Sequence, residues 1–232
     1  MAKDVIIACD FPDAAATYGF LGKFKGRKPF VKIGMELFYS EGPDIVKNIK
    51  DSGHGIFLDL KLHDIPNTVR GGMRSLSSLG VDMVNVHASG GSAMMEAAIE
   101  GLSSGSGERP LLIAVTVLTS TDAARLRNEA LVGESLEATV AHYASLAARS
   151  GLDGVVCSPL EAKGVKEICG ESFLTVTPGI RFADGAADDQ KRIATPAFAK
   201  ENGSDYIVVG RAVTAAADPV AAYERCIADF IG

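Results

Sequence analysis

One short segment of the chain alternates charged and apolar side chains in a pattern that could support chemistry. Residues 57–64 read F-L-D-L-K-L-H-D, so Asp59 and Lys61 stand two positions apart and Asp64 follows three positions later. In a strand, residues i and i+2 lie on one face, roughly 6.6 Å apart along the chain. Asp59 and Lys61 therefore share a face. A carboxylate and an ammonium placed this way suit proton donation and neutralisation of a carbanion.

Two more charges end earlier apolar runs. Asp10 ends the first run and Lys32 ends the second, so together with the 59–64 segment the signs nearly alternate. A lysine flanked by carboxylates keeps its proton at neutral pH, because opposite charges favour the ammonium form. Such a lysine is a poor Schiff-base nucleophile, since that chemistry needs the free amine.

A second group of residues near the end of the chain predicts a phosphate site. The apolar run 206–209 leads into Gly210 and Arg211, where glycine allows close approach of a ligand and the guanidinium can bind an anion with two hydrogen bonds. The run before it ends T-P-G-I-R at Arg181 and is followed by a polar loop through Gln190. In α/β barrels, the loops after strands seven and eight commonly bind phosphate.

The elements that must position these residues follow a regular rhythm. Runs rich in Val, Ile and Leu predict eight strands, at 5–10, 30–33, 55–61, 83–87, 111–116, 154–157, 173–177 and 206–209. Segments with helical period separate them, such as 36–52 and 135–149. Most strands are too apolar to face water, which is typical of a parallel sheet covered by helices. No sequence repeat beyond this alternation is apparent.

This rhythm predicts an α/β fold, a single TIM (β/α)8 barrel that occupies residues 1–232 as one domain. A doubly wound open sheet is the alternative. The first strand runs into C-D-F-P, residues 9–12, and not into the glycine-rich turn of a dinucleotide site, which weakens that alternative.

Composition narrows the class of protein. The chain has 232 residues, of which 47% are hydrophobic and 22% charged, as in an ordinary globular domain and unlike a disordered chain. Its formal net charge of −6 argues against nucleic acid as a partner. The four cysteines are scattered without a C-x-x-C pair, which favours buried thiols in a reducing compartment. We find no signal peptide and no apolar stretch of membrane-spanning length, and expect a cytoplasmic protein without a membrane partner.

Residues 57–68, F-L-D-L-K-L-H-D-I-P-N-T, closely resemble the signature of the orotidine 5′-phosphate decarboxylase family. The similarity extends over most of the chain, through A-C-D-F, V-K-I-G-M-E-L-F, V-N-V-H-A, V-T-V-L-T-S, T-P-G-I-R and V-V-G-R. The charged D-x-K-x-x-D motif alone is shared with relatives in the same superfamily, whereas I-P-N-T and the upstream lysine make the match specific. Cys9, before Asp10, is a mild departure from the usual apolar residue.

This resemblance implies decarboxylation of orotidine 5′-monophosphate to UMP and CO2, the last step of de novo UMP synthesis, without a metal or an organic cofactor. The residues matching the family's catalytic tetrad are Lys32, Asp59, Lys61 and Asp64, with Lys61 as the proton donor to C6 of the pyrimidine. Asp10 and Lys32 are implied to contact the ribose.

The resemblance also implies a homodimer with shared active sites, in which Asp64, Ile65 and Thr68 enter the partner subunit's site. The remaining substrate-binding residues implied are Thr119 near the pyrimidine, Pro178 at the end of strand seven, Arg181 at the base of a closing loop, and Gln190, Gly210 and Arg211 at the phosphate. The loop itself is expected at residues 182–189.

Two other functions are weighed. One is an Mg²⁺-dependent sugar-phosphate decarboxylase or aldolase of the same superfamily, which would use Asp10 and Asp59, with Glu36, as metal ligands. The other is a non-catalytic phosphate- or nucleotide-binding protein. Lys32 and the I-P-N-T segment disfavour the first, and the complete array of charges disfavours the second.

Overall fold

The strands of the protein close into a barrel. The computed structural model describes residues 3–104, 108–183 and 194–232. Within them, eight parallel strands pair each with the next, and β8 pairs with β1. The strands are β1 (Asp4–Ala8), β2 (Phe30–Gly34), β3 (Ile56–Leu62), β4 (Met83–His87), β5 (Leu111–Val115), β6 (Gly154–Val156), β7 (Leu174–Thr177) and β8 (Tyr206–Val209). The predicted barrel is confirmed, and the open sheet is wrong.

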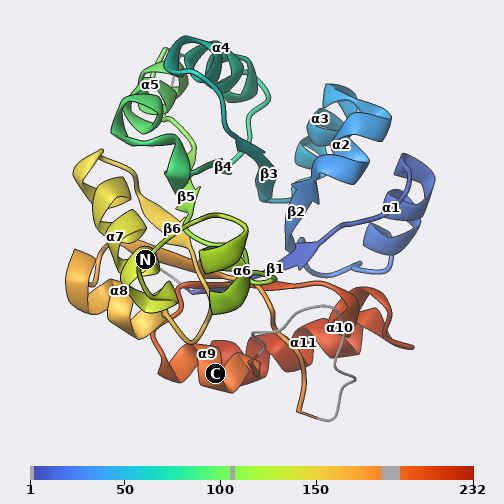
Figure 1. Cartoon of the computed structure of the whole chain (residues 1–232). Helices are drawn as coiled ribbons and strands as arrows, with labels where there is room; N and C mark the ends of the chain where they lie inside the picture. Colours follow the sequence, from blue (N-terminus) through green and yellow to red (C-terminus); the bar gives the residue numbers. More distant parts are fainter. Residues whose placement is uncertain (1–2, 105–107, 184–193) are drawn as a thin grey trace.

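Helices cover the outside of the barrel, and most of them follow one another around it in chain order (Figure 1). They are α1 (Ala14–Leu21), α2 (Met35–Glu41), α3 (Pro43–Asp51), α4 (Pro66–Ser77), α5 (Ser92–Leu102), α6 (Ala123–Asn128), α7 (Leu136–Arg149), α8 (Ala162–Cys169), α9 (Pro196–Glu201), α10 (Arg211–Thr214) and α11 (Pro219–Phe230), with a 3₁₀ turn η1 (Ala88–Gly90) after β4.

Alternation along the strands sorts apolar side chains into two cores. In β1, Val5 and Ile7 belong to the large core between the strands and the helices, whereas Ile6 and Ala8 point into the barrel. The barrel interior is filled by a smaller cluster made of Ile6, Ala8, Phe57, Met83, Ile113, Val176 and Val208. Because both faces of the sheet are buried, the strands read as continuous apolar runs.

The helix expected over residues 36–52 is wrong as a single element. The structure contains α2 and α3 there, separated at Gly42, whose φ of 70° is a conformation that other residues rarely adopt. Pro43 then occupies the first position of α3, where its missing N–H and fixed φ are tolerated. The helix expected at 135–149 is confirmed as α7, with the Ser135 side chain accepting a hydrogen bond from the Ala138 N–H at 3.1 Å.

The amino-terminal ends of the even-numbered strands after β2 carry a repeat that the sequence analysis missed. Each of β4, β6 and β8 is preceded by Gly-x-Asp, with the aspartate directly before the strand, at Asp82, Asp153 and Asp205. One carboxylate oxygen of each accepts a backbone N–H from the preceding strand. These donors are Ile56 at 2.7 Å, Leu112 at 2.7 Å and Thr175 at 2.8 Å. Each aspartate thus joins two adjacent strands.

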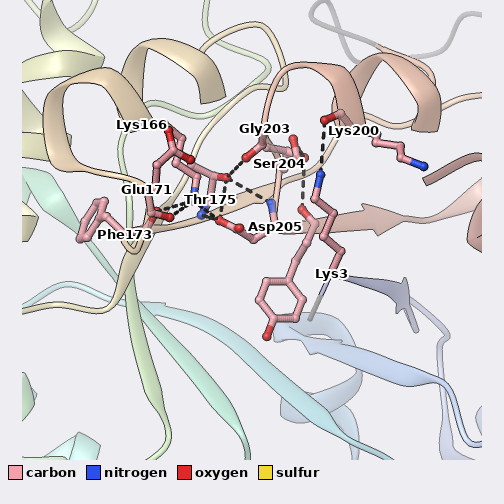
Figure 2. A network of polar contacts seen from close by, with 11 residues as sticks. Lys3, Lys166, Glu171, Phe173, Thr175, Lys200, Gly203, Ser204 and Asp205 are labelled. Atoms are coloured by element: carbon pink, nitrogen blue, oxygen red, sulfur yellow. Dashed lines mark hydrogen bonds and ion pairs between the residues drawn. The ribbon is translucent and has the colours of Figure 1, made fainter. Parts of the chain in front are cut away.

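A cation completes each of these three junctions. Lys50 pairs with Asp82 at 2.6 Å, Arg109 forms a two-pronged pair with Asp153, and Lys166 pairs with Asp205 at 2.6 Å. The Lys166 junction is the most buried. Its ammonium also donates to the Glu171 and Phe173 carbonyls at 2.8 and 2.9 Å, so all its protons have acceptors (Figure 2).

The cysteines are free thiols, and Cys9, Cys157 and Cys226 are buried. Burial raises the pKa of Cys9 to about 12, so this thiol is not a nucleophile at neutral pH. Across the ranges that the structure describes, no helix is long and apolar enough to cross a membrane.

Candidate active site

A cavity of about 540 Å³ opens where the strands of the barrel end. Most of the predicted site residues line it: Asp10, Lys32, Asp59, Lys61, Thr119, Pro178, Arg181, Gly210 and Arg211. These residues come from the whole length of the chain, so closure of the barrel brings them together. A cavity of this size suits a small molecule.

Charged side chains cross one wall of the cavity in an alternating row. Lys32 Nζ lies 3.0 Å from Asp10 Oδ1 and 3.3 Å from Asp59 Oδ2, and Lys61 Nζ lies 2.6 Å from Asp59 Oδ1. The predicted shared face of Asp59 and Lys61 is confirmed, since Leu58 and Leu60 pack outward in the large core. We call Asp10, Lys32, Asp59 and Lys61 the charged row.

Electrostatics in the row fix its charge states. Burial lowers the pKa of Lys32, but the adjacent Asp59 and Asp10 outweigh it, so the pKa stays above its ordinary value. For Asp59, burial raises the pKa, and the Lys32 and Lys61 ammonium groups more than reverse this, leaving it below its usual range. Both groups are therefore ionised at neutral pH, as the sequence predicted for a lysine between carboxylates.

The backbone that carries Lys61 is irregular. Lys61 has φ of 52°, in the left-handed region, and the pairing of β3 with β4 shifts register between Leu58 and Leu62. Asn85 of β4 fills the gap in the pairing. Its Oδ1 accepts the Lys61 N–H at 2.8 Å, and its Nδ2 donates to Asp59 Oδ1 at 2.7 Å. The sequence reasoning missed Asn85, an amide between two valines of β4.

The part of the cavity at the ends of β7 and β8 has the features expected of an anion site. Gly210 and Arg211 follow β8, and Arg211 is solvent-exposed. The helix that Arg211 begins, α10, has only four residues, so its dipole adds little and the guanidinium is the main attraction for an anion. Arg181, with 9% of its surface exposed, donates its backbone N–H to the Ala194 carbonyl at 2.9 Å.

The cavity also has an apolar lining that the sequence reasoning did not single out. It consists of Phe57, Val115, Val117, Val156 and Val208. Thr119 lies at the edge of this lining, partly buried. A flat apolar ring with a polar edge would fit such a surface.

Three predicted residues do not reach the cavity of their own chain. Asp64, Ile65 and Thr68 are exposed around the start of α4, and Ile65 keeps 67% of its surface accessible. Asp64 Oδ1 accepts the N–H of the adjacent Ile65 at 2.6 Å and does not contact the charged row. Gln190 lies outside the described residues, as does the expected loop from position 184 onward.

Over the described ranges, no three or more His, Cys, Asp or Glu side chains are grouped as potential metal ligands. Glu36, a candidate ligand in the metal-dependent alternative, is exposed in the first turn of α2 and does not line the cavity.

Comparison with known proteins agrees with this geometry. The sequence model of the orotidine 5′-phosphate decarboxylase / HUMPS family matches residues 3–226. A curated orotidine 5′-phosphate decarboxylase from Bacillus cereus is 58% identical over 227 residues, which cover 97% of this chain and 95% of the relative. That from Bacillus cytotoxicus is 57% identical with the same coverage.

Solved structures show the same likeness. The orotidine 5′-phosphate decarboxylase of Lactobacillus acidophilus superimposes with a TM-score of 0.90 at 45% identity, covering 99% of this chain and 100% of that one. An uncharacterized conserved protein from Geobacillus kaustophilus gives a TM-score of 0.88 at 52% identity, covering 97% of this chain and 99% of that one. The chain therefore belongs to the orotidine 5′-phosphate decarboxylase / HUMPS family.

Proposed function

We propose that this protein decarboxylates orotidine 5′-monophosphate to UMP and CO2, and so completes UMP biosynthesis. The observation that carries the proposal is that the charged row, the Arg211 guanidinium and an apolar lining all meet in one cavity. The curated relatives at 57% and 58% identity are named for this activity. The row would hold the reacting end of the nucleotide, and the guanidinium its phosphate.

The reaction breaks the bond between C6 of the pyrimidine and its carboxylate carbon. The electron pair stays on C6 as a vinylic carbanion outside the ring π-system, and CO2 leaves. The Lys61 ammonium then donates a proton to C6, forming the C–H bond of UMP, and the amine regains its proton from solvent. An ammonium next to this carbon is most stabilising in the transition state, which is the type of interaction that raises kcat.

Asp59 serves this step in two ways. It holds Lys61 Nζ at 2.6 Å, and its negative charge would lie near the substrate carboxylate. Two unit charges about 4 Å apart repel by about 4 kcal/mol at an effective dielectric constant near 20, and this repulsion disappears as neutral CO2 departs. Lys32, bound to both Asp59 and Asp10, keeps the row aligned and, with Asp10, would contact the ribose.

The phosphate would be bound at the end of β8 by Gly210 and Arg211, together with Gln190. This contact is remote from C6, so its binding energy is available to orient the reacting end of the substrate, and Arg181 lines the same part of the cavity. Pro178 and Thr119 would contact the pyrimidine side of the nucleotide.

Completion of the tetrad requires a second subunit in this proposal. Asp64, Ile65 and Thr68 project from the start of α4 away from their own cavity, and an apolar side chain as exposed as Ile65 favours a protein contact. Proline at position 66 biases Ile65 toward extended geometry, which supports this projection. We propose a homodimer in which Asp64 enters the partner's site.

We further propose that residues 1–232 act as one domain and that the protein is cytoplasmic. The first rests on a barrel whose last strand pairs with its first, and the second on free, mostly buried thiols.

The direct test is an absorbance assay of orotidine 5′-monophosphate with the purified protein, with and without EDTA. We expect the substrate absorbance to decay to that of UMP at the same rate in both. Folded protein that forms no UMP would overturn the proposal. Loss of activity in EDTA would favour the Mg²⁺-dependent alternative, although the position between Asp10 and Asp59 is taken by Lys32 Nζ.

The shared site is tested by mixing two variants, Lys61→Ala and Asp64→Ala, under conditions of subunit exchange. If Asp64 acts across the interface, one site of each heterodimer carries both lesions and the other carries none, so activity returns. If both residues serve their own chain, every site keeps one lesion. No recovery despite verified exchange would refute the shared site.

A further inference from the structure

We infer that Asn85 is a positioning residue for the reaction, because its carboxamide holds the bulge in β3 that carries Lys61 and also binds Asp59, the partner of Lys61. The inference rests on the proposed function for its kinetic readout. The family resemblance gives Asn85 no role, and the residue does not line the cavity.

The bulge is visible in the register of the two strands. Leu58 pairs with Val84, and Leu62 pairs with Val86. Three residues of β3 (Asp59, Leu60 and Lys61) therefore face one residue of β4, Asn85. Extra residues on one strand leave ladder groups without their usual partners, and such irregularities are common beside active sites. A buried N–H left without an acceptor is costly, so something must replace the ladder bond.

Asn85 supplies the missing partners with both ends of one side chain. Its Oδ1 accepts the Lys61 backbone N–H, and its Nδ2 donates to Asp59 Oδ1, at 2.8 and 2.7 Å. Only 1% of the residue is exposed, so water cannot replace either bond. An amide carries an acceptor oxygen and a donor nitrogen on two separate atoms of one planar group. A hydroxyl, a carboxylate or an apolar side chain does not have this arrangement.

The two bonds act on the two residues whose contact the chemistry needs. Lys61 is held at φ of 52°, a conformation that costs a residue with a side chain roughly 1–2 kcal/mol. Asp59 Oδ1 receives both the Asn85 amide and Lys61 Nζ, so one oxygen joins the bulge to the ammonium. Without the amide, the Lys61 N–H loses its acceptor and Lys61 is free to leave the left-handed region, which would shift Nζ relative to Asp59 Oδ1.

The test compares Asn85→Leu with the parent and with a control in the same strand. Asn85→Leu keeps the number and branching of the side-chain heavy atoms and removes both bonds. We expect kcat to fall by about 100-fold, as for a reacting group displaced by about 1 Å, while the dissociation constant of UMP changes less than threefold. Met83→Leu, a fully buried change in β4 outside the cavity, should keep kcat within threefold. Asn85→Leu with kcat within threefold of the parent would overturn the inference.

A second variant separates positioning from a loss of folding. In Asn85→Asp, only the protonated carboxyl can donate to Asp59 while its other oxygen accepts the Lys61 N–H. The charged groups around it are Asp59 and Lys61 from β3, Lys32 from β2, and His87 at the end of β4 with His63 beside its ring. We expect the ratio of variant kcat to parent kcat to rise at least tenfold from pH 8 to pH 5.5. A ratio that stays constant would contradict the inference.

A crystal structure of Asn85→Leu provides a readout that does not depend on activity. We expect Lys61 to leave the left-handed region and its Nζ to separate from Asp59. An unchanged Lys61 backbone would overturn the inference even if the parent proved to lack decarboxylase activity. A parent without that activity would instead refute the proposed function, and the geometry of position 61 would still decide the role of Asn85.

Discussion

The two ends of the barrel use the same pairs of charges in opposite ways. At the amino-terminal end, Asp205 accepts the Thr175 N–H and the Lys166 ammonium, so both of its partners are fixed parts of the scaffold. At the carboxyl-terminal end, Asp59 is bound by Lys32, Lys61 and Asn85, and the two lysines also face the cavity. The charges of the first arrangement bind only other parts of the scaffold, whereas the lysines of the second also remain accessible to a ligand in the cavity.

The two ends of the barrel also differ in which residues adopt a positive φ. The Gly-x-Asp junctions place their positive φ on glycine, at Gly80, Gly151 and Gly203, where it costs little. The charged row places a positive φ on Lys61. Changes at the amino-terminal end should therefore reduce stability without affecting turnover, and changes at the carboxyl-terminal end should chiefly reduce turnover.

The largest effect is expected from Lys61→Ala. Turnover should fall by at least about 1,000-fold, because the cation that meets the carbanion is removed. The matched variant Lys61→Gly should be as inactive but more stable by about 1 kcal/mol, because glycine relieves the left-handed strain. Steady-state kinetics and urea unfolding measure the two effects. Turnover within tenfold of the parent, or equal stability of the two variants, would contradict this account.

Lys166→Ala tests the other end. Removing the ammonium leaves the Asp205 carboxylate without its cation, and we expect the free energy of unfolding to drop by about 3 kcal/mol with kcat unchanged. Lys163→Ala, an exposed lysine of the same helix, is the control. Lys50→Ala, whose side chain is 33% exposed, should cost less than about 1 kcal/mol. Equal losses for Lys166 and Lys50 would show that burial does not set the strength of these junctions.

Arg211→Ala should weaken substrate binding and leave the ion pairs of the charged row in place. A charge-assisted hydrogen bond contributes about 2 kcal/mol, so kcat/KM should fall by about 30-fold. The free energy of unfolding should stay within about 0.5 kcal/mol of the parent, as for other surface substitutions. An unchanged kcat/KM would mean that the phosphate is held by other groups.

The smallest effect is expected in the acid dependence of stability. The Lys32 and Lys61 ammonium groups keep the folded pKa of Asp59 below the value of an unfolded chain, despite burial. The carboxylate thus contributes stability above the unfolded pKa, near pH ~4, and this contribution is lost as pH falls through the folded pKa. Urea unfolding of the parent should lose stability more steeply below pH 4 than that of Asp59→Asn. If the free energy of unfolding of the two proteins fell equally steeply below pH 4, the stabilisation of the Asp59 carboxylate by Lys32 and Lys61 would be contradicted.

Much of this architecture could be predicted from local pattern. The apolar runs gave every strand to within two residues at each end, and period-two alternation placed Asp59 and Lys61 on one face. Helix splitting at Gly42 was readable too, since glycine followed by proline ends one helix and begins another. The Gly-x-Asp repeat was present in the sequence, but its meaning depends on which strands are adjacent.

The remaining features depend on contacts between strands. The pattern of residues 57–62 is the same with or without a bulge, because the extra residues are counted only against β4. Asn85 therefore has no local signal for its role. Likewise, whether Asp64 serves its own chain or a partner depends on a surface that one sequence does not specify.

The seam between β1 and β8 has a consequence for biosynthesis. All members of the charged row and Asn85 lie within the first 85 residues. However, one edge of β1 can form its backbone hydrogen bonds only after β8, which ends at Val209, has been synthesised. At ribosomal speeds of 5–20 residues per second, one edge of β1 stays unpaired for roughly 10–40 s after its synthesis. That edge belongs to a strand that is apolar on both faces, through Val5, Ile6 and Ile7. Nascent chains of this protein should therefore bind chaperones until the last strand emerges, and premature termination before β8 should give an aggregating product.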